Sequence, residues 1–244
     1  MRDLETEQCG QEAAVAQRSS AAGMVALSVL AIIGAAHGAL VVVYLGFRFS
    51  AELDPMAQAV SYYVYVDGAR LRFTVALLEI AFAGVALTAG LVRAGVIGRV
   101  SALVLMNCWS AGIVLVALFP TDDDPRIMSF SGVVHQVAGA SLFVTLPIAA
   151  LLSLRGISEL PEWRDLVGLL RWTSVATLVF ALSYLIARLP DIAPTWVVAA
   201  WIGDLEVGGL AQRTLFACEA VLVLALAVRL LAVSRRDRLG GGDQ

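Results

Sequence analysis

The sequence contains no lysine and carries little charge of either sign. All 17 basic residues are arginine, and charged residues make up only 15% of the 244 residues. A soluble domain of this size carries about 25% charged residues. This shortage, combined with 59% hydrophobic residues, excludes an ordinary soluble domain and indicates a chain that lies in hydrocarbon. The exclusive use of arginine is typical of a GC-rich bacterial genome.

Cysteine is also scarce, and familiar catalytic motifs are missing. Cys9, Cys108 and Cys218 lie far apart with no CxxC spacing, so neither a zinc knuckle nor a disulfide framework is indicated. The sequence has no GxxxxGKS/T, no GxGxxG after a strand and no GxSxG. A net charge of −3 gives no reason to expect a nucleic-acid partner, and no feature identifies a cofactor.

What the chain does have is a set of long apolar runs. A helix that spans a bilayer needs about 20 mostly apolar residues, and six segments meet this requirement. We therefore predict an all-α polytopic membrane protein with a bundle of six transmembrane helices over residues 22–233. No signal-peptide pattern precedes it, so we expect residues 1–21 and 234–244 to be cytoplasmic tails. The predicted helices are Ala22–Phe47, Arg72–Val92, Gly98–Phe119, Ser131–Leu154, Leu169–Arg188 and Arg213–Val233.

The distribution of arginine predicts the orientation. With the N-terminus inside, eleven of the 17 arginines flank inner helix ends and six flank outer ends. Cytoplasmic flanks carry the excess of positive charge. We therefore expect a protein of the bacterial inner membrane with both termini on the cytoplasmic side. Tyr62, Tyr63 and Tyr65 then suit an aromatic belt on the outer side, and residues 189–213 form an outer loop with a short interfacial helix. The six outer arginines are Arg48, Arg70, Arg72, Arg126, Arg188 and Arg213.

Four ionisable residues lie inside the predicted helices, where such groups are expensive and by default functional. At about 1.5 Å per residue, His37 lies roughly 16 Å below the outer end of its helix. Glu79, Glu219 and His135 lie about 10, 9 and 6 Å deep by the same measure. The sequence therefore predicts an extracytoplasmic polar pocket. Its candidate residues are His37, Glu79, Asp122, His135, Arg213 and Glu219.

The stretch from Phe119 to His135 is the most distinctive part of this polar set. Pro120 ends the third helix, and Ser129 or Ser131 is suited to cap the fourth. Asp122 and His135 are predicted to form a carboxylate–imidazole pair across this hairpin. Asp123 and Asp124 are expected to face water. Small Gly34 and Gly38, in the first helix, are predicted to allow close helix packing.

Three functional hypotheses follow. The first is a non-enzymatic protein that binds a lipid, small ligand or partner through its outer face. The second is a lipid hydrolase in which Asp122, His135 and Glu79, with His37, hold a metal or a water, although no HxxxH or HxxE spacing is present. A small transporter is the third, and it is disfavoured because Pro147 is the sole proline inside a helix. The alternative to all three is that each buried group makes one interhelical hydrogen bond.

Several motifs together resemble a bacterial six-helix membrane family, the domain of unknown function DUF998. They are ELDPMAQAVSYYVYVDG after the first helix, VALFPTDDDP after the third, SGVVHQVAGASLFVTLPIAALL in the fourth and GLAQR at the start of the sixth. The resemblance covers about Ala22 to Val233 and implies an integral membrane protein with six helices. It implies no particular activity. A looser likeness of layout links the chain to the Frag1/DRAM/Sfk1 group of lipid-related membrane proteins.

Overall fold

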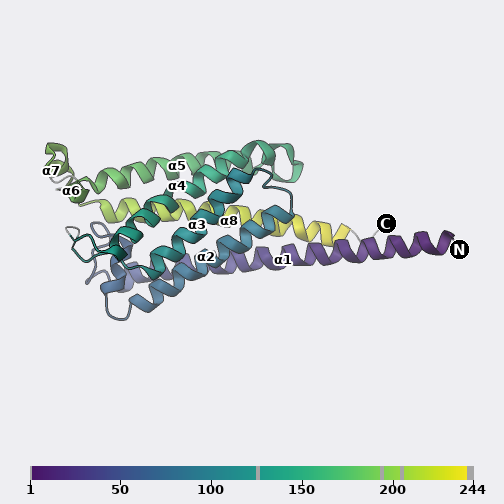
Figure 1. The fold of residues 1–244 in the computed structure, drawn as a ribbon, viewed down its shortest axis with the longest axis horizontal. Helices are drawn as coiled ribbons and strands as arrows, with labels where there is room; N and C mark the ends of the chain where they lie inside the picture. The colour runs from purple at the N-terminus through teal and green to yellow at the C-terminus, as the bar shows by residue number, and fades with distance from the viewer. Residues whose placement is uncertain (1, 125–126, 193–194, 204–205, 241–244) are drawn as a thin grey trace.

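The computed structural model describes residues 2–124, 127–192, 195–203 and 206–240, and within them it contains helices and no strand. Six helices are long and four are short (Figure 1). The long helices are α1 (Arg2–Arg48), α2 (Arg70–Arg93), α3 (Val100–Leu118), α4 (Phe130–Glu159), α5 (Leu166–Ala187) and α8 (Gly208–Gly240). The short ones are η1 (Val60–Tyr65), η2 (Pro161–Trp163), α6 (Leu189–Ile192) and α7 (Val197–Gly203).

The six long helices form a closed ring. Each packs against the next in the chain, and α8 completes the ring by packing between α5 and α1. Because the helices alternate in direction, α1 begins and α8 finishes at the same end, which we call the termini end (Figure 1). The opposite end, which carries η1, α6 and α7, is called the loop end.

All six long helices contain a segment that is long and apolar enough to cross a membrane. The predicted fold class is therefore confirmed, and the chain is a multi-pass membrane protein. α4 continues five residues beyond the predicted end, and α8 begins five residues before the predicted start. Hydropathy marks only the part of a helix that lies in hydrocarbon, whereas backbone hydrogen bonding continues into the interface.

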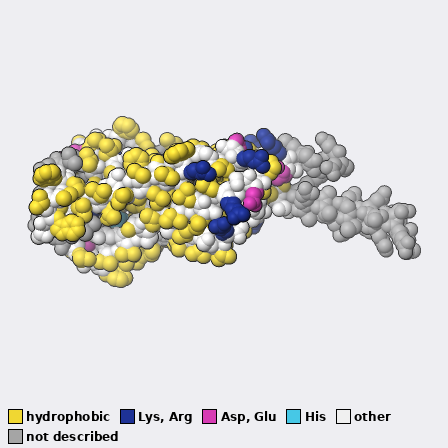
Figure 2. Space-filling view, turned by 90° about the horizontal axis from the view of Figure 1, so that it is seen from above, with side chains coloured by type: hydrophobic (Ala, Val, Ile, Leu, Met, Phe, Trp, Pro, Cys, Tyr) yellow, Lys and Arg dark blue, Asp and Glu magenta, His cyan; other side chains and the backbone are white. Residues whose placement is uncertain are grey.

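The outer surface of the bundle is apolar. Figure 2 shows a mostly hydrophobic body, with the charged side chains of that face gathered toward the termini end. The short helix predicted between the last two spans is present as α7, and Trp196, which precedes it, and Trp201, which lies in it, are exposed. Exposed indoles at a helix end are typical of the membrane interface.

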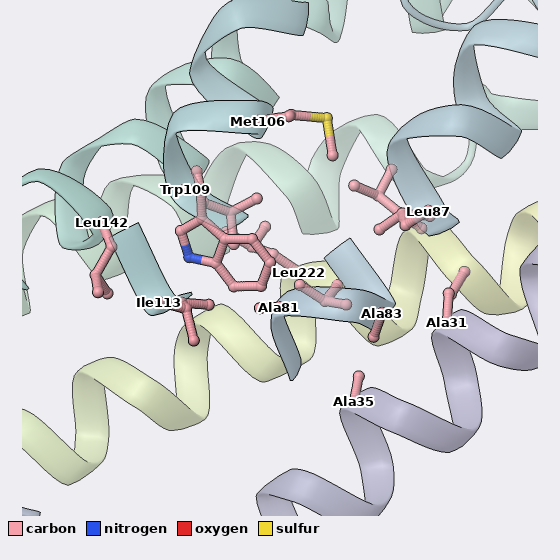
Figure 3. Close-up of a cluster of buried hydrophobic side chains, with 14 of the residues drawn as sticks. Ala31, Ala35, Ala81, Ala83, Leu87, Met106, Trp109, Ile113, Leu142 and Leu222 are labelled. Carbon is pink, nitrogen blue, oxygen red and sulfur yellow. The ribbon is translucent and has the colours of Figure 1, made fainter. Parts of the chain in front are cut away.

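The interior is organised around Trp109 of α3, which is 2% exposed (Figure 3). Ala81 of α2 and Leu222 of α8 lie near the indole, and Ala35 of α1 and Leu142 of α4 belong to the same buried cluster. Gly84 of α2 leaves space for the indole, because a Cβ atom at that position would lie 2.6 Å from Cζ3 of Trp109.

The contact between α1 and α2 depends on two glycines. A Cβ atom on Gly34 would lie 2.9 Å from the backbone oxygen of Glu79, and one on Gly38 would lie 2.8 Å from that of Ala76. Both separations are shorter than a carbon and an oxygen tolerate. The packing role predicted for this GxxxG pair is therefore confirmed, within one chain.

Candidate functional site

The start of α8 is hydrogen-bonded to the loop that follows α1. The guanidinium of Arg213 donates to the backbone oxygens of Pro55 and Gln58, at 2.7 Å each, and to the hydroxyl of Tyr63 at 3.1 Å. Gln212 accepts a hydrogen bond from the backbone N–H of Val60 at 2.7 Å. We call this arrangement the Arg213 clamp. It joins the two motifs DPMAQAVSYY and GLAQR, which lie about 150 residues apart in the chain.

The clamp changes the interpretation of Tyr63. The sequence predicts an interfacial tyrosine, yet Tyr63 is fully buried, at 0% exposure, and its hydroxyl accepts from Arg213. Tyr65, in contrast, is half exposed, and its hydroxyl donates to the backbone oxygen of Thr121. Burial and the nearby carboxylates of Asp123 and Asp122 raise the pKa of Tyr65. This hydroxyl therefore keeps its proton, and its ability to donate, at neutral pH.

The stretch between α3 and α4 is held by its own hydrogen bonds. Asp122 accepts from the backbone N–H of Ser129 at 3.2 Å and from its hydroxyl at 2.5 Å. The Ser129 hydroxyl in turn accepts from the N–H of Gly132 at 3.0 Å, which makes Ser129 the cap of α4 as predicted. Pro125 and Arg126 lie outside the described residues.

The predicted pair between Asp122 and His135 is not formed. His135 is buried, and its Nδ1 hydrogen-bonds to the backbone oxygen of Phe119 at 2.8 Å. A carbonyl oxygen can only accept, so Nδ1 carries the proton. Phe119 directly follows α3, and its carbonyl has no helical partner, so the imidazole binds there while Asp122 binds Ser129.

The residues that were predicted to share one pocket lie in separate places. His37 and Glu79 pair with each other, with Nδ1 and Oε2 2.6 Å apart, on the outer surface of α1 and α2. Glu219 lies inside the bundle and His135 near the start of α4. Within the part of the chain that the structure describes, no three His, Cys, Asp or Glu side chains are grouped to hold a metal ion. The three proposed catalytic residues thus have different neighbours.

Glu219 is the most unusual of these groups because it is 2% exposed. Its Oε2 accepts a long hydrogen bond, 3.3 Å, from the indole N–H of Trp109, and its Oε1 has no hydrogen-bond partner. Trp109 was not among the predicted site residues. The sequence feature that could have identified Trp109 is its position in the middle of a predicted span, because a buried indole N–H needs a hydrogen-bond partner.

Glu219 and Arg213 line a cavity of about 490 Å³ between α1 and α8, which is within the range of roughly 300 to 1,000 Å³ for ligand sites. We call it the α1–α8 cavity. Its other walls are almost entirely apolar. It reaches the outside of the bundle beside Val43 and Phe47, which are both exposed. Representative wall residues are Ala39, Val42, Ile80, Ile113, Ala217 and Ala220.

A second cavity, of about 460 Å³, lies between α4, α5 and α8 near the loop end. Its walls include His135, Gln136, Arg188 and Gln212, so they are more polar than those of the α1–α8 cavity. Phe216 borders both cavities and stands between them. The residues predicted for one pocket are therefore divided, because Arg213 and Glu219 line the α1–α8 cavity and His135 lines the second cavity.

Comparison with known proteins places the chain in a family. No curated protein and no solved structure matches it. Residues 32–229, which include parts of all six spans, match the model of a family described as "Protein of unknown function (DUF998)". The protein is therefore a member of the DUF998 family, as the motifs in its loops and fourth helix indicate.

Proposed function

We propose that the protein binds a lipid-like amphiphile in the α1–α8 cavity. The observation that carries the proposal is the unpartnered Oε1 of Glu219 in the wall of a large apolar cavity. A buried polar atom without a hydrogen bond costs about 1–3 kcal/mol, and a ligand with a hydroxyl or amide N–H would remove this cost. The apolar walls accept a hydrocarbon chain, and the exposed edge at Val43 and Phe47 gives access from the bilayer.

Arg213 favours a ligand with an anionic headgroup. The guanidinium lies six residues before Glu219 on α8, about 9 Å nearer the loop end. Its hydrogen bonds go to backbone oxygens and a hydroxyl, and none of the ion pairs among described residues involves it. Its positive charge is therefore uncompensated at the mouth of the cavity, where a headgroup would lie.

The test is photolabelling of the purified protein in nanodiscs by a diazirine-bearing acyl lipid, in phosphatidylglycerol and phosphatidylcholine forms. We expect Ala220→Trp or Ala39→Trp, which fill the cavity, to reduce labelling of α1 and α8 peptides at least about tenfold, a loss of about 1.4 kcal/mol. Glu219→Leu is expected to reduce it as well, because the ligand loses its polar contact.

Val179→Trp is the matched control, since Val179 is exposed on α5 and lines neither cavity. It is expected to leave labelling unchanged. Stronger labelling by the anionic lipid would support the role of Arg213. Equal labelling of the wild type and both cavity-filling variants would show that lipid does not occupy this cavity.

We also infer that the protein lies in a bacterial inner membrane and that its termini end faces the cytoplasm. Support comes from the eleven arginines that flank this end against six at the loop end. In a variant with all three cysteines changed to serine, an impermeant maleimide should label Glu52→Cys in intact cells. Arg236→Cys should react only after permeabilisation. Both side chains are exposed, so the reverse pattern would mean the opposite orientation.

A further inference from the structure

The pair of His37 and Glu79 has no role in either cavity, yet it lies on the surface of the bundle. Its two side chains are 59% and 34% exposed, and their contact measures 2.6 Å. His37 lies eleven residues before the end of α1, about 16 Å along the helix, and Glu79 lies nine residues into α2, about 14 Å. Both groups are therefore at the depth of the hydrocarbon core, where ionisable groups that face lipid are costly.

Large apolar side chains surround this pair on the same surface. Ile33 and Leu40 lie one turn to either side of His37 on α1, and they are 60% and 66% exposed. Val75 and Phe82 take the equivalent places beside Glu79 on α2, at 43% and 59%. We call these six residues the α1–α2 face. Among the described residues, α1 and α2 otherwise pack mainly against α3, η1 and α8, and the side chains of this face remain exposed.

The pair presents one hydrogen-bond donor and one acceptor, so the same pair on a second copy of the chain could satisfy both. Because a net charge is costly in hydrocarbon, the neutral form of the pair is favoured, and it holds two protons in all, one of them between His37 Nδ1 and Glu79 Oε2. The second proton is on the other ring nitrogen, Nε2, which remains as a donor, and Glu79 Oε1 remains as an acceptor. Neither atom has a hydrogen-bond partner among the described residues. A lipid chain offers no partner for either atom, whereas a twofold axis brings the donor of one copy to the acceptor of another.

We propose that a second copy of the chain packs on the α1–α2 face around a twofold axis. Each His37 donates from Nε2 to Glu79 of the other copy, and the four surrounding apolar residues interdigitate. The contact removes both polar pairs from lipid and satisfies their remaining hydrogen-bonding atoms. This proposal rests on the surface of α1 and α2 and is independent of ligand binding in the α1–α8 cavity.

Disulfide crosslinking in native membranes tests the interface. In a background without Cys9, Cys108 and Cys218, single cysteines are introduced at Ile33, Leu40, Val75 and Phe82. A disulfide needs Cα atoms within about 7 Å, so residues close to the axis should form covalent dimers of this chain on mild oxidation. Val179→Cys, exposed on α5, is the control and should remain monomeric.

A pair of double variants separates the interface from general folding. His37→Leu with Glu79→Leu makes the face wholly apolar and should reduce dimer formation at least about tenfold, with the cavity photolabelling retained. The exchanged pair, His37→Glu with Glu79→His, should retain most of the dimer. Failure of all four cysteines to crosslink, or an undiminished yield in the double leucine variant, would overturn the proposal. Capture of a different protein instead of a second copy would also overturn it.

Discussion

Replacing Arg213 by methionine should lower the free energy of unfolding by about 3–5 kcal/mol, because hydrogen bonds from a charged donor contribute about 1.5–3 kcal/mol each. Methionine keeps the apolar stem but leaves the backbone oxygens of Pro55 and Gln58 and the hydroxyl of Tyr63 without their donor. Arg213→Lys keeps the charge but not the forked geometry, so an intermediate loss is expected. The measurement is unfolding by SDS in mixed micelles, with the loss read from the shift in midpoint.

Thr214→Val provides the neighbouring control on α8. Its hydroxyl donates at 2.9 Å to the backbone oxygen of Leu210, one turn back in the same helix, and it joins no loop. The expected change is within about 0.5 kcal/mol. If Arg213→Met were as stable as Thr214→Val, the Arg213 clamp would not hold the first loop to α8.

The second large effect is expected where Gly34 and Gly38 of α1 pack closely against α2, a contact that we call the glycine seam. The double variant Gly34→Val, Gly38→Val should lose about 4 kcal/mol or more, which exceeds the usual cost of overpacking because backbone atoms oppose both side chains. The oxygens of Glu79 and Ala76 lie 2.9 and 2.8 Å from the new Cβ positions. Neither oxygen can move unless α2 moves away from α1. The measurement is the same SDS unfolding titration, combined with the yield of folded protein.

Gly139→Val in α4 is the matched control for this seam. A Cβ atom there meets nothing within 4 Å, so the variant changes the same residue type in a long helix without a clash. Its stability should remain within about 1 kcal/mol of the wild type, the range of helix propensity. Equal losses in the control and the seam variant would mean that helix propensity, and not close packing, explains the effect.

These two features also set the geometry of the proposed sites. Gly38 and Gly34 bring α1 close enough to α2 for His37 to reach Glu79. The Arg213 clamp fixes the loop at Pro55, which forms the end of the α1–α8 cavity. Seam variants that still fold should therefore form less of the proposed dimer, whereas clamp variants should mainly affect lipid labelling.

The sequence alone was sufficient for the six spans, the all-α class and the close-packed glycine pair. Each depends on neighbouring residues along one helix: an apolar run of sufficient length, or two small residues one turn apart. A serine cap at Ser129 or Ser131 was also predictable, because a cap acts within four residues of itself, and the structure shows that Ser129 is the cap. The motifs DPMAQAVSYY and GLAQR are distinctive in the sequence, but the sequence did not predict that Arg213 joins them. Contacts between residues about 150 positions apart depend on how the ring closes.

The polar residues show most clearly what the tertiary structure decides. The distance of a residue from the end of its helix follows from the sequence, and His37, Glu79 and Glu219 lie in helices that are long and apolar enough to cross a membrane. The direction in which each side chain points around its helix did not follow, because these helices are apolar on nearly all sides. Packing turned Glu79 toward His37 on the outer surface and Glu219 toward Trp109 in the interior. The sequence therefore determined the depth of the ionisable groups, while the arrangement of six helices in a ring determined which of them meet.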